Sequence, residues 1–153
     1  MYQALQAAGI QFDYQKHIPF TACGLGSETA CAYADFVITT PWGYTFLECD
    51  EEQHSRYPVQ CDVRRDFDIR ASVTLGTNDK IKIIHYNPDS FRFDGEPQFV
   101  SKASRIARLL DVLPEEPMGF ERIFMFYDST SDNPLPLVAV NWQNGGAIGA
   151  RVA

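Results

Sequence analysis

The sequence lacks a long apolar run. None of its segments approaches the roughly 18 consecutive apolar residues of a membrane-spanning helix, and no charged segment followed by an apolar one marks a secretory signal. It also lacks closely paired cysteines of the zinc-binding type, because Cys23, Cys31, Cys49 and Cys61 are widely separated. We therefore expect reduced, mostly buried thiols and an intracellular protein of the cytoplasm or nucleus, away from membranes. A metal or disulfide role stays open for Cys23 and Cys31.

Positive charge is scarce. The chain has 13 Lys and Arg against 20 Asp and Glu, a net charge of −7. Taken alone, this argues against a general nucleic-acid binder, whose field is normally positive. A dense acidic site that needs a divalent cation would contribute to the excess. The length of 153 residues and the hydrophobic fraction of 45% fit one domain with its own core.

The hydrophobic pattern predicts a mixed order of helices and strands. Helices are expected at 1–9, 59–75 and 99–113, and strands at 10–20, 33–39, 44–50, 80–88, 121–128 and 137–142. Apolar residues Val59, Val63, Phe67 and Ala71 recur at helical spacing in the second helix. The fold class is therefore α/β or α+β. We expect a single domain over 1–142 and a flexible tail over 143–153.

The segment "YTFLECDEEQH" places carboxylates at the end of an apolar strand. Side chains alternate along a strand, so Glu48 and Asp50 share one face, and the apolar character of both faces indicates a central strand. Burying two ionised carboxylates is costly without compensation, which a bound cation supplies. A hairpin would bring Asp35 across from Glu48 or Asp50. Three converging carboxylates predict a site for Mg²⁺ or Mn²⁺.

Further polar residues follow this strand. Histidine ordinarily titrates near neutral pH, so His54 is a candidate general acid or base. Asp62, on the next helix, is a candidate to orient it, and Arg64 and Arg65 begin a positive patch where a phosphate could lie. Each residue alone has an ordinary interpretation, such as a solvated carboxylate or a surface histidine. The combination, together with Asp35 and the Glu-x-Asp pair, favours a functional site.

The segments "ADFVI", "FLECDEEQH", "CDVRR" and "KIIHYNPDSF" together resemble the PD-(D/E)xK nuclease superfamily. The branch they resemble is the one around the very short patch repair endonuclease and the EDxHD homing endonucleases, and the match covers about 33–87. The resemblance implies a restriction-endonuclease-like mixed sheet flanked by helices. It also implies a metal-dependent endonuclease that hydrolyses DNA phosphodiesters, of a homing, mobile-element, nicking or repair type.

Carried over by residue, the resemblance assigns catalytic roles to five positions. Asp35 and Asp50 are metal-site carboxylates, and Glu48 joins or tunes that site. His54 is the catalytic histidine and Asp62 its partner. Arg65 and Arg64 remain candidates for contacting DNA.

The sequence departs from the superfamily at three places. Asp50 stands where the superfamily name has a lysine, although the EDxHD branch tolerates this. Glu51 stands where relatives often have glycine. The leading helix carries Gln3 and Gln6 where the superfamily often has an acidic residue.

Lys102, Arg105 and Arg108 recur every three residues along the third helix. Each is a candidate to neutralise a phosphate of DNA, and an ordinary solvated helix face is the alternative. Because positive charge is scarce, we expect a separate DNA-targeting domain or a larger parent chain. Two other functions stay open: a catalytically silent nuclease fold that binds DNA or protein in an assembly, and a metal enzyme acting on a small phosphate ester.

Overall fold

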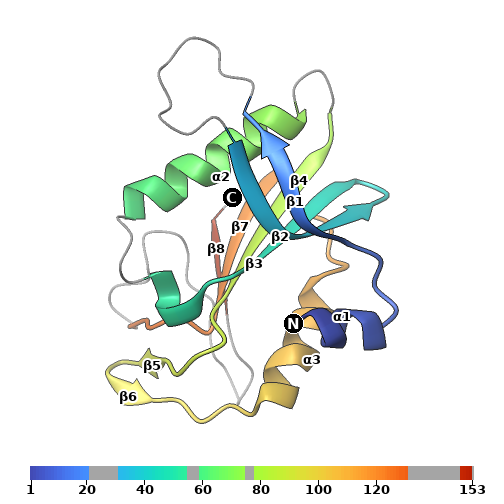
Figure 1. The fold of residues 1–153 in the computed structure, drawn as a ribbon. Coiled ribbons are helices and arrows are strands. Elements are labelled where there is room, and N and C mark those ends of the chain that lie inside the picture. The colour runs from blue at the N-terminus through green and yellow to red at the C-terminus, as the bar shows by residue number, and fades with distance from the viewer. Residues whose placement is uncertain (21–30, 55–58, 75–77, 131–148, 153) are drawn as a thin grey trace.

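The computed structural model describes residues 1–20, 31–54, 59–74, 78–130 and 149–152. They form a mixed α/β structure around a mixed sheet flanked by helices (Figure 1). The helices are α1 (Tyr2–Ala7), α2 (Val59–Thr74) and α3 (Lys102–Val112), with a 3₁₀ turn η1 at Glu51–His54. The strands are β1 (Asp13–Pro19), β2 (Cys31–Thr40), β3 (Gly43–Cys49), β4 (Lys80–Tyr86), β5 (Arg92–Phe93), β6 (Glu96–Pro97), β7 (Phe120–Met125) and β8 (Gly149–Val152).

The main sheet has the strand order β1-β2-β3-β4-β7-β8. Strands β1, β2 and β3 form an antiparallel meander, after which β4 pairs parallel to β3 and β7 parallel to β4. Strand β3 is therefore central, as its two apolar faces predict, and the three expected helices are confirmed. The carboxyl ends of β3, β4 and β7 meet at one edge of the sheet, the usual place for a ligand in such folds.

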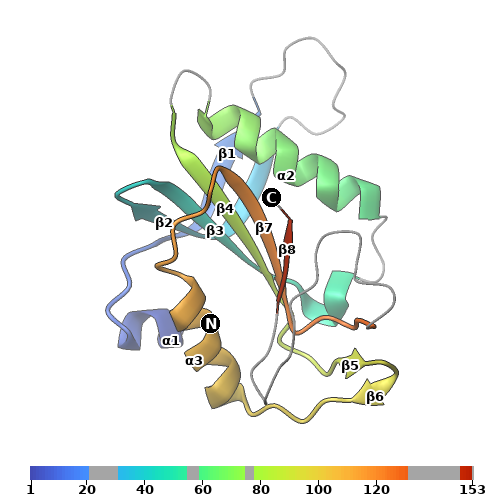
Figure 2. The same cartoon turned by 180° about the vertical axis from the view of Figure 1, so that it is seen from behind.

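Helices cover both faces of this sheet. Helix α2 lies on one side, and α1 and α3 lie on the other (Figures 1 and 2). The core is correspondingly divided in two. Under α1 and α3 it contains Leu5, Leu47, Ile84, Leu109 and Ile123, and under α2 it contains Ala34, Phe46, Ile69, Ile81 and Ile83.

The predicted hairpin between β2 and β3 is confirmed, and its turn requires glycine. Gly43 has a φ of 144°, and a Cβ atom there would lie 2.1 Å from the carbonyl oxygen of Lys80. The hydroxyl of Thr40 donates to the Gly43 carbonyl at 2.9 Å. The turn therefore fixes the register that places the residues of β2 opposite those of β3.

The buried face of α2 differs from its apolar spacing. Asp66 and Ile69 are fully buried. Phe67, in contrast, is 49% exposed, and its ring lies tilted against that of Phe120, with centroids 5.4 Å apart. Ala71 is exposed. A charged residue occupies the inner face because partners inside the protein neutralise it, and apolar spacing carries no sign of such partners.

Other segments also differ from expectation or fall outside the description. The short hairpin of β5 and β6, turning at Asp94 and Gly95 with positive φ, was not predicted. Gly149–Val152 form β8, paired antiparallel to β7, within the expected flexible tail. The strand expected at 137–142 lies outside the described residues.

The three described cysteines are free. Cys31 and Cys49 are half-buried and Cys61 is exposed, so the expectation of mostly buried thiols is wrong for these three, and Cys23 lies outside the described residues. In the described part of the chain, no helix has the length and apolar character needed to cross a membrane.

A fully buried lysine holds the carboxyl end of α3. The ammonium of Lys82 donates to the carbonyl oxygens of Val112, Leu113 and Glu115 at 2.7, 2.9 and 2.5 Å. These are carbonyls that a helix end leaves without partners inside the helix. Lys82 therefore ties the end of α3 to the middle of β4.

We predict that Lys82→Met lowers the free energy of unfolding by about 3 kcal/mol, because it leaves buried carbonyls without a donor. Lys80→Met on the same strand is the matched control. Lys80 is half-exposed and pairs with Glu116 at the surface, so its loss should cost under about 1 kcal/mol. Urea unfolding of both variants measures the difference, and equal losses would contradict a capping role for Lys82.

Candidate active site at the carboxyl edge of the sheet

Asp35 lies where β2 and β3 separate. Their registered pairing ends at Phe36 and Leu47. Beyond it, the Oδ2 atom of Asp35 accepts a hydrogen bond from the Cys49 amide at 2.9 Å, so a side chain replaces a backbone acceptor. Gln15, whose φ is 50°, donates its side-chain amide to Oδ1 at 2.8 Å. The carboxylate is therefore held in the opening between the two strands.

The two ends of β2 face opposite sides of the sheet. Ala34 packs in the core under α2, whereas Phe36 and Ile38 pack under α1 and α3. Ala32 packs in the same part of the core as Ala34. Strict alternation of side chains along the strand would instead place these four even-numbered residues on one face. We attribute this change of face to an irregularity of the strand at Asp35. Local irregularities of this kind change the direction of side chains and are common near functional sites.

Glu48 lies beside Asp35, as the hairpin predicts. Its Oε2 atom is 3.5 Å from the Asp35 amide nitrogen, and its Oε1 atom accepts from Arg65 at 3.1 Å. The side chain is 4% exposed. Burial raises the pKa of Glu48, with Asp35 adding to the rise, and Arg65 opposes it without cancelling it. The Glu48 carboxylate thus lies against the backbone of Asp35, near enough to the Asp35 charge to feel it, with Arg65 as its counter-charge.

Asp50 faces a different set of partners. Its Oδ2 atom accepts from the Nδ1 atom of His85 at 2.6 Å and from the Tyr127 hydroxyl at 2.5 Å. It is 2% exposed. Among the described residues, no three His, Cys, Asp or Glu side chains are grouped so as to hold a metal. In the described part of the chain, Asp50 therefore binds His85 and Tyr127, and it does not converge with Asp35 and Glu48 as the sequence led us to expect.

His85 is a buried bridge between two carboxylates. It is 1% exposed, and its second ring nitrogen, Nε2, lies 2.8 Å from the Oδ2 atom of Asp66. The ring stacks on Phe124 with centroids 4.5 Å apart. Each ring nitrogen faces a carboxyl oxygen, so each is placed to donate a proton. Burial alone would lower the pKa of His85, but Asp66 and Asp50 raise it to about 10.

Asp66 also binds Arg122 of β7. The Nε atom of Arg122 donates to the Oδ2 atom of Asp66 at 2.7 Å, and Nη2 lies 2.5 Å from the same oxygen. Burial would raise the pKa of Asp66, yet His85 and Arg122 together lower it. The sequence led us to expect that a bound cation stabilises the buried carboxylates. Positively charged side chains of the protein itself provide much of this stabilisation instead.

The turn that follows Asp50 is held in an unusual backbone conformation. Glu52 and Gln53 of η1 have φ values of 53° and 55°, which non-glycine residues adopt rarely and at some cost. The Glu52 amide donates to Asp89 at 2.8 Å, and the Gln53 side chain accepts from the Asp128 amide at 2.7 Å. The ends of β4 and β7 thus fix the segment that carries His54, whose own side chain lies outside the described residues.

Asp62 and Arg64 lie on the first turns of α2. Asp62 is half-buried, and its charge, together with that of Asp50, contributes to raising the pKa of Tyr127 beyond the effect of burial. Arg64 is exposed and lies 3.8 Å from Asp68, whereas Arg65 turns inward to Glu48.

The three predicted basic residues of α3 do not form one surface row. Arg105 is 8% exposed and donates to the carbonyls of Asn87 and Asp89 at 3.3 and 2.6 Å, so its expected contact with DNA is wrong in this conformation. Arg108 is exposed beside Asp111. Lys102 is exposed, so its ammonium group remains a candidate to contact an anion.

The sequence-based prediction did not identify four residues that contact Asp50 directly or through one another: Asp66, His85, Arg122 and Tyr127. A usable signal existed in "KIKIIHY" and "ERIFMFYD", where single polar residues interrupt apolar strands. Polar groups buried in strands are normally paired.

Comparisons with protein-family models, with curated proteins and with solved structures found no match for the chain.

We predict that Asp66→Ala lowers the free energy of unfolding by about 3 to 5 kcal/mol, because it leaves His85 and Arg122 as buried cations without their shared carboxylate. Asp68→Ala on the same helix is the control. Asp68 forms only a surface pair with Arg64, so its removal should change stability by less than about 0.5 kcal/mol. Similar losses in the two variants would rule out the buried bridge.

We also predict that His85 stays protonated well above neutral pH. Its folded pKa of about 10 exceeds the ordinary histidine pKa of 6.5, so its stabilising contribution is complete below pH 6.5 and is lost as the pH rises through 10. Imidazole ¹⁵N NMR at increasing pH measures this directly. A His85 titration near 6.5 would show that the bridge is not an imidazolium.

Proposed function

We propose that this domain has a restriction-endonuclease-like core and is a metal-dependent nuclease that hydrolyses DNA phosphodiesters. The observation that carries the proposal is the Asp35–Glu48 pair, brought together at the fork of a hairpin beside the carboxyl edge of the sheet. The mixed sheet with helices on both faces supports it. So does the resemblance over 33–87.

The carboxylate pair fits a hard divalent cation such as Mg²⁺ or Mn²⁺. Magnesium is usually held by one or two carboxylates together with substrate phosphates and water, so two ligands suffice. Glu48 is a buried carboxyl group whose pKa stays raised despite Arg65, and a neighbouring cation would favour its ionised form. Such a cation would activate water and stabilise charge on a phosphoryl oxygen. Asp50 is less suited to this role, because His85 and Tyr127 hold its Oδ2 atom.

The chain's own residues take distinct parts in the proposed reaction. Arg65 orients Glu48 by hydrogen bonding to Oε1. The His85 bridge fixes Asp50 and, through it, the start of the strained turn η1 that presents His54. His54 transfers the proton, as the resemblance implies, and Asp62 is its expected partner.

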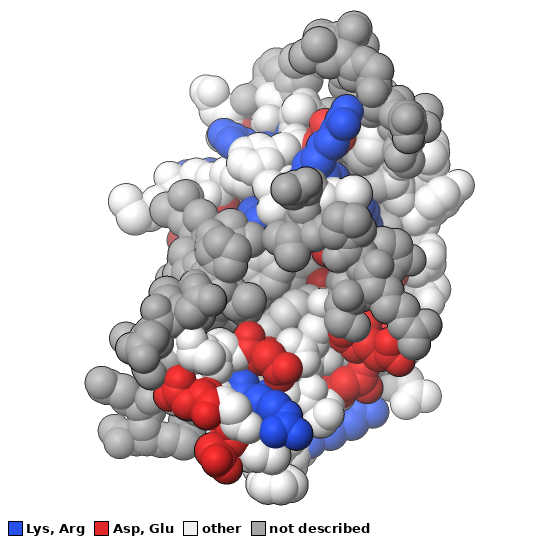
Figure 3. Space-filling view, turned by 90° about the vertical axis from the view of Figure 1, so that its left-hand side faces the viewer, with Lys and Arg blue, Asp and Glu red and all other residues white. Residues whose placement is uncertain are grey.

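A second candidate is a catalytically silent fold that binds DNA or protein in an assembly. It is favoured by the pairing of Glu48, Asp50 and Asp66 with Arg65, His85 and Arg122, which stabilises the carboxylates without a metal. Acidic side chains predominate on the lower part of the face shown in Figure 3, with basic side chains between them. This mixed surface favours a protein partner over the backbone of DNA. Calorimetry with Mn²⁺ separates the two, since a silent fold of this kind has no need to bind the ion.

The test of the nuclease proposal is cleavage of supercoiled plasmid and of single-stranded DNA with Mg²⁺ or Mn²⁺. We expect nicking that EDTA abolishes and that falls at least about 100-fold in Asp35→Asn and Glu48→Gln, because charge stabilisation of several kcal/mol is lost. His54→Ala should also lose activity. Asp50→Asn should lose activity together with stability.

Asp13→Asn is the matched control, since Asp13 is an exposed carboxylate of β1 paired with Lys16. It should cleave like the unmodified protein. Thermal unfolding of each variant distinguishes lost chemistry from lost structure. Cleavage that persists equally in Asp35→Asn and Glu48→Gln would contradict the proposed site.

A further inference from the structure

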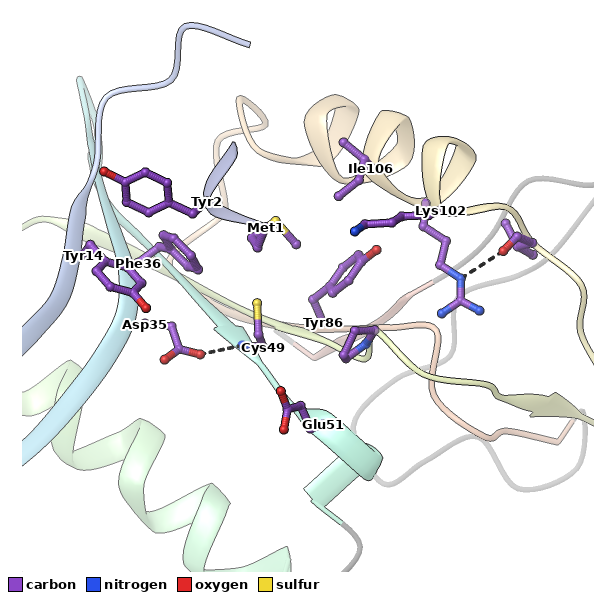
Figure 4. Close-up of a pocket in the computed structure, with 13 residues that line it drawn as sticks. Met1, Tyr2, Tyr14, Asp35, Phe36, Cys49, Glu51, Tyr86, Lys102 and Ile106 are labelled. Carbon is purple, nitrogen blue, oxygen red and sulfur yellow. Dashed lines mark hydrogen bonds between the residues drawn. The ribbon is translucent and has the colours of Figure 1, made fainter. Parts of the chain in front are cut away.

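A pocket of about 690 Å³ lies between α1, α3 and the sheet. Its lining includes Tyr14 and Phe36 on one side and Tyr86 and Lys102 on the other, as Figure 4 shows. Asp35 reaches its edge. The pocket therefore shares a carboxylate with the Asp35–Glu48 pair, although Glu48 itself does not line it.

The aromatic side of this pocket is open to a flat ligand. Tyr14 is 55% exposed, and its ring lies 5.3 Å from that of Phe36 and 5.4 Å from that of Tyr2. Aromatic rings of this kind bind bases of single strands by stacking, which is tolerant of sequence.

The opposite side carries a cation that has no partner in the described part of the chain. The Lys102 ammonium makes no ion pair or hydrogen bond there, and Figure 4 shows the side chain directed toward the pocket. Neighbouring Arg105, by contrast, is held by backbone carbonyls. An unpaired lysine across from aromatic rings suits the phosphate of a nucleotide whose base is stacked.

The overall charge favours base contacts over backbone contacts. A net charge of −7 opposes the electrostatic attraction that supplies most non-specific binding of duplex DNA. A paired base inside a duplex cannot enter a pocket without being extruded. Binding through stacking is therefore favoured in a strand that is already unpaired, because no base pair has to be broken.

We propose that this pocket binds one unpaired nucleotide of a DNA strand, so that the strand passes Asp35 and single-stranded or locally unpaired DNA is the preferred substrate. The base stacks on Tyr14 beside Phe36, and its phosphate faces Lys102. The inference rests on the proposed nuclease function for the class of ligand. The pocket itself is independent of catalysis, because binding there needs no metal.

The experiment is fluorescence anisotropy of a labelled single-stranded oligonucleotide and its duplex, with the full chain in EDTA. The single strand should bind at least about tenfold tighter than the duplex. Tyr14→Ala and Lys102→Gln should each weaken single-strand binding by about five- to tenfold. Both substitutions replace exposed side chains, so little loss of stability is expected.

Two controls match these variants. Tyr33→Ala removes an aromatic group that is 59% exposed on β2 but does not line the pocket. Lys80→Gln removes a half-exposed charge that pairs with Glu116 at the surface, also outside the pocket lining. Both should bind single strands like the unmodified protein.

Equal affinity for single strand and duplex, or equal effects of pocket and control variants, would overturn the inference, as would the absence of binding. The two proposals fail separately. Single-strand binding that depends on Tyr14 and Lys102, without metal-dependent cleavage, would refute the nuclease and leave the pocket. Cleavage that depends on Asp35 but not on Tyr14 or Lys102 would refute the pocket alone.

Discussion

The buried imidazolium of His85 is the interaction on which the carboxyl edge of the sheet depends. One ring joins Asp50, just past β3, to Asp66 in the middle of α2. It is itself part of β4 and stacks on Phe124 of β7. Four elements are therefore fixed to one another by a single charged group. Because burial opposes the charge, the bridge is stable only while both carboxylates remain ionised beside it.

A second constraint is the separation of β2 from β3 at Asp35. It explains how residues on both faces of the sheet contribute to one proposed site. Where β2 leaves β3, the Asp35 carboxylate replaces a backbone acceptor for Cys49, and the side chains of β2 change faces. Asp35 consequently meets Glu48 and also borders the pocket under α1 and α3. In the proposed function, this places the reacting phosphate and the bound base on either side of one carboxylate.

The charges of the site also bear on the proposed function, in which an acidic protein binds an acidic polymer. Arg65, His85 and Arg122 neutralise the buried carboxylates nearby, so they leave little positive field at the surface. Lys102 is the exposed cation that borders the pocket. Affinity is then expected from stacking and from a divalent cation rather than from a basic face.

Local patterns were sufficient for part of this structure. Alternation along β3 and the breakers in the turn predicted the hairpin, which was expected to bring Asp35 across from Glu48 or Asp50. In the structure Glu48 is the neighbour. The bridge could not be predicted in the same way, because it depends on the register of β4 against β3 and on the rotation of α2. Apolar spacing placed Phe67 with the inner residues of α2, whereas charge pairing with His85 and Arg122 brings Asp66 inside. The burial of Arg105 likewise depends on carbonyls after β4 that lie far from it in sequence.

The most direct measurement is a crystal structure with Mn²⁺, located by its anomalous scattering. We expect a peak within ligand distance of both Asp35 and Glu48, with the His85 bridge to Asp50 and Asp66 intact. A peak held by Asp50 with His85 displaced would contradict the proposed division of roles among the carboxylates. A crystal without a bound ion at Asp35 and Glu48, at Mn²⁺ concentrations that saturate such sites, would contradict the metal-dependent nuclease.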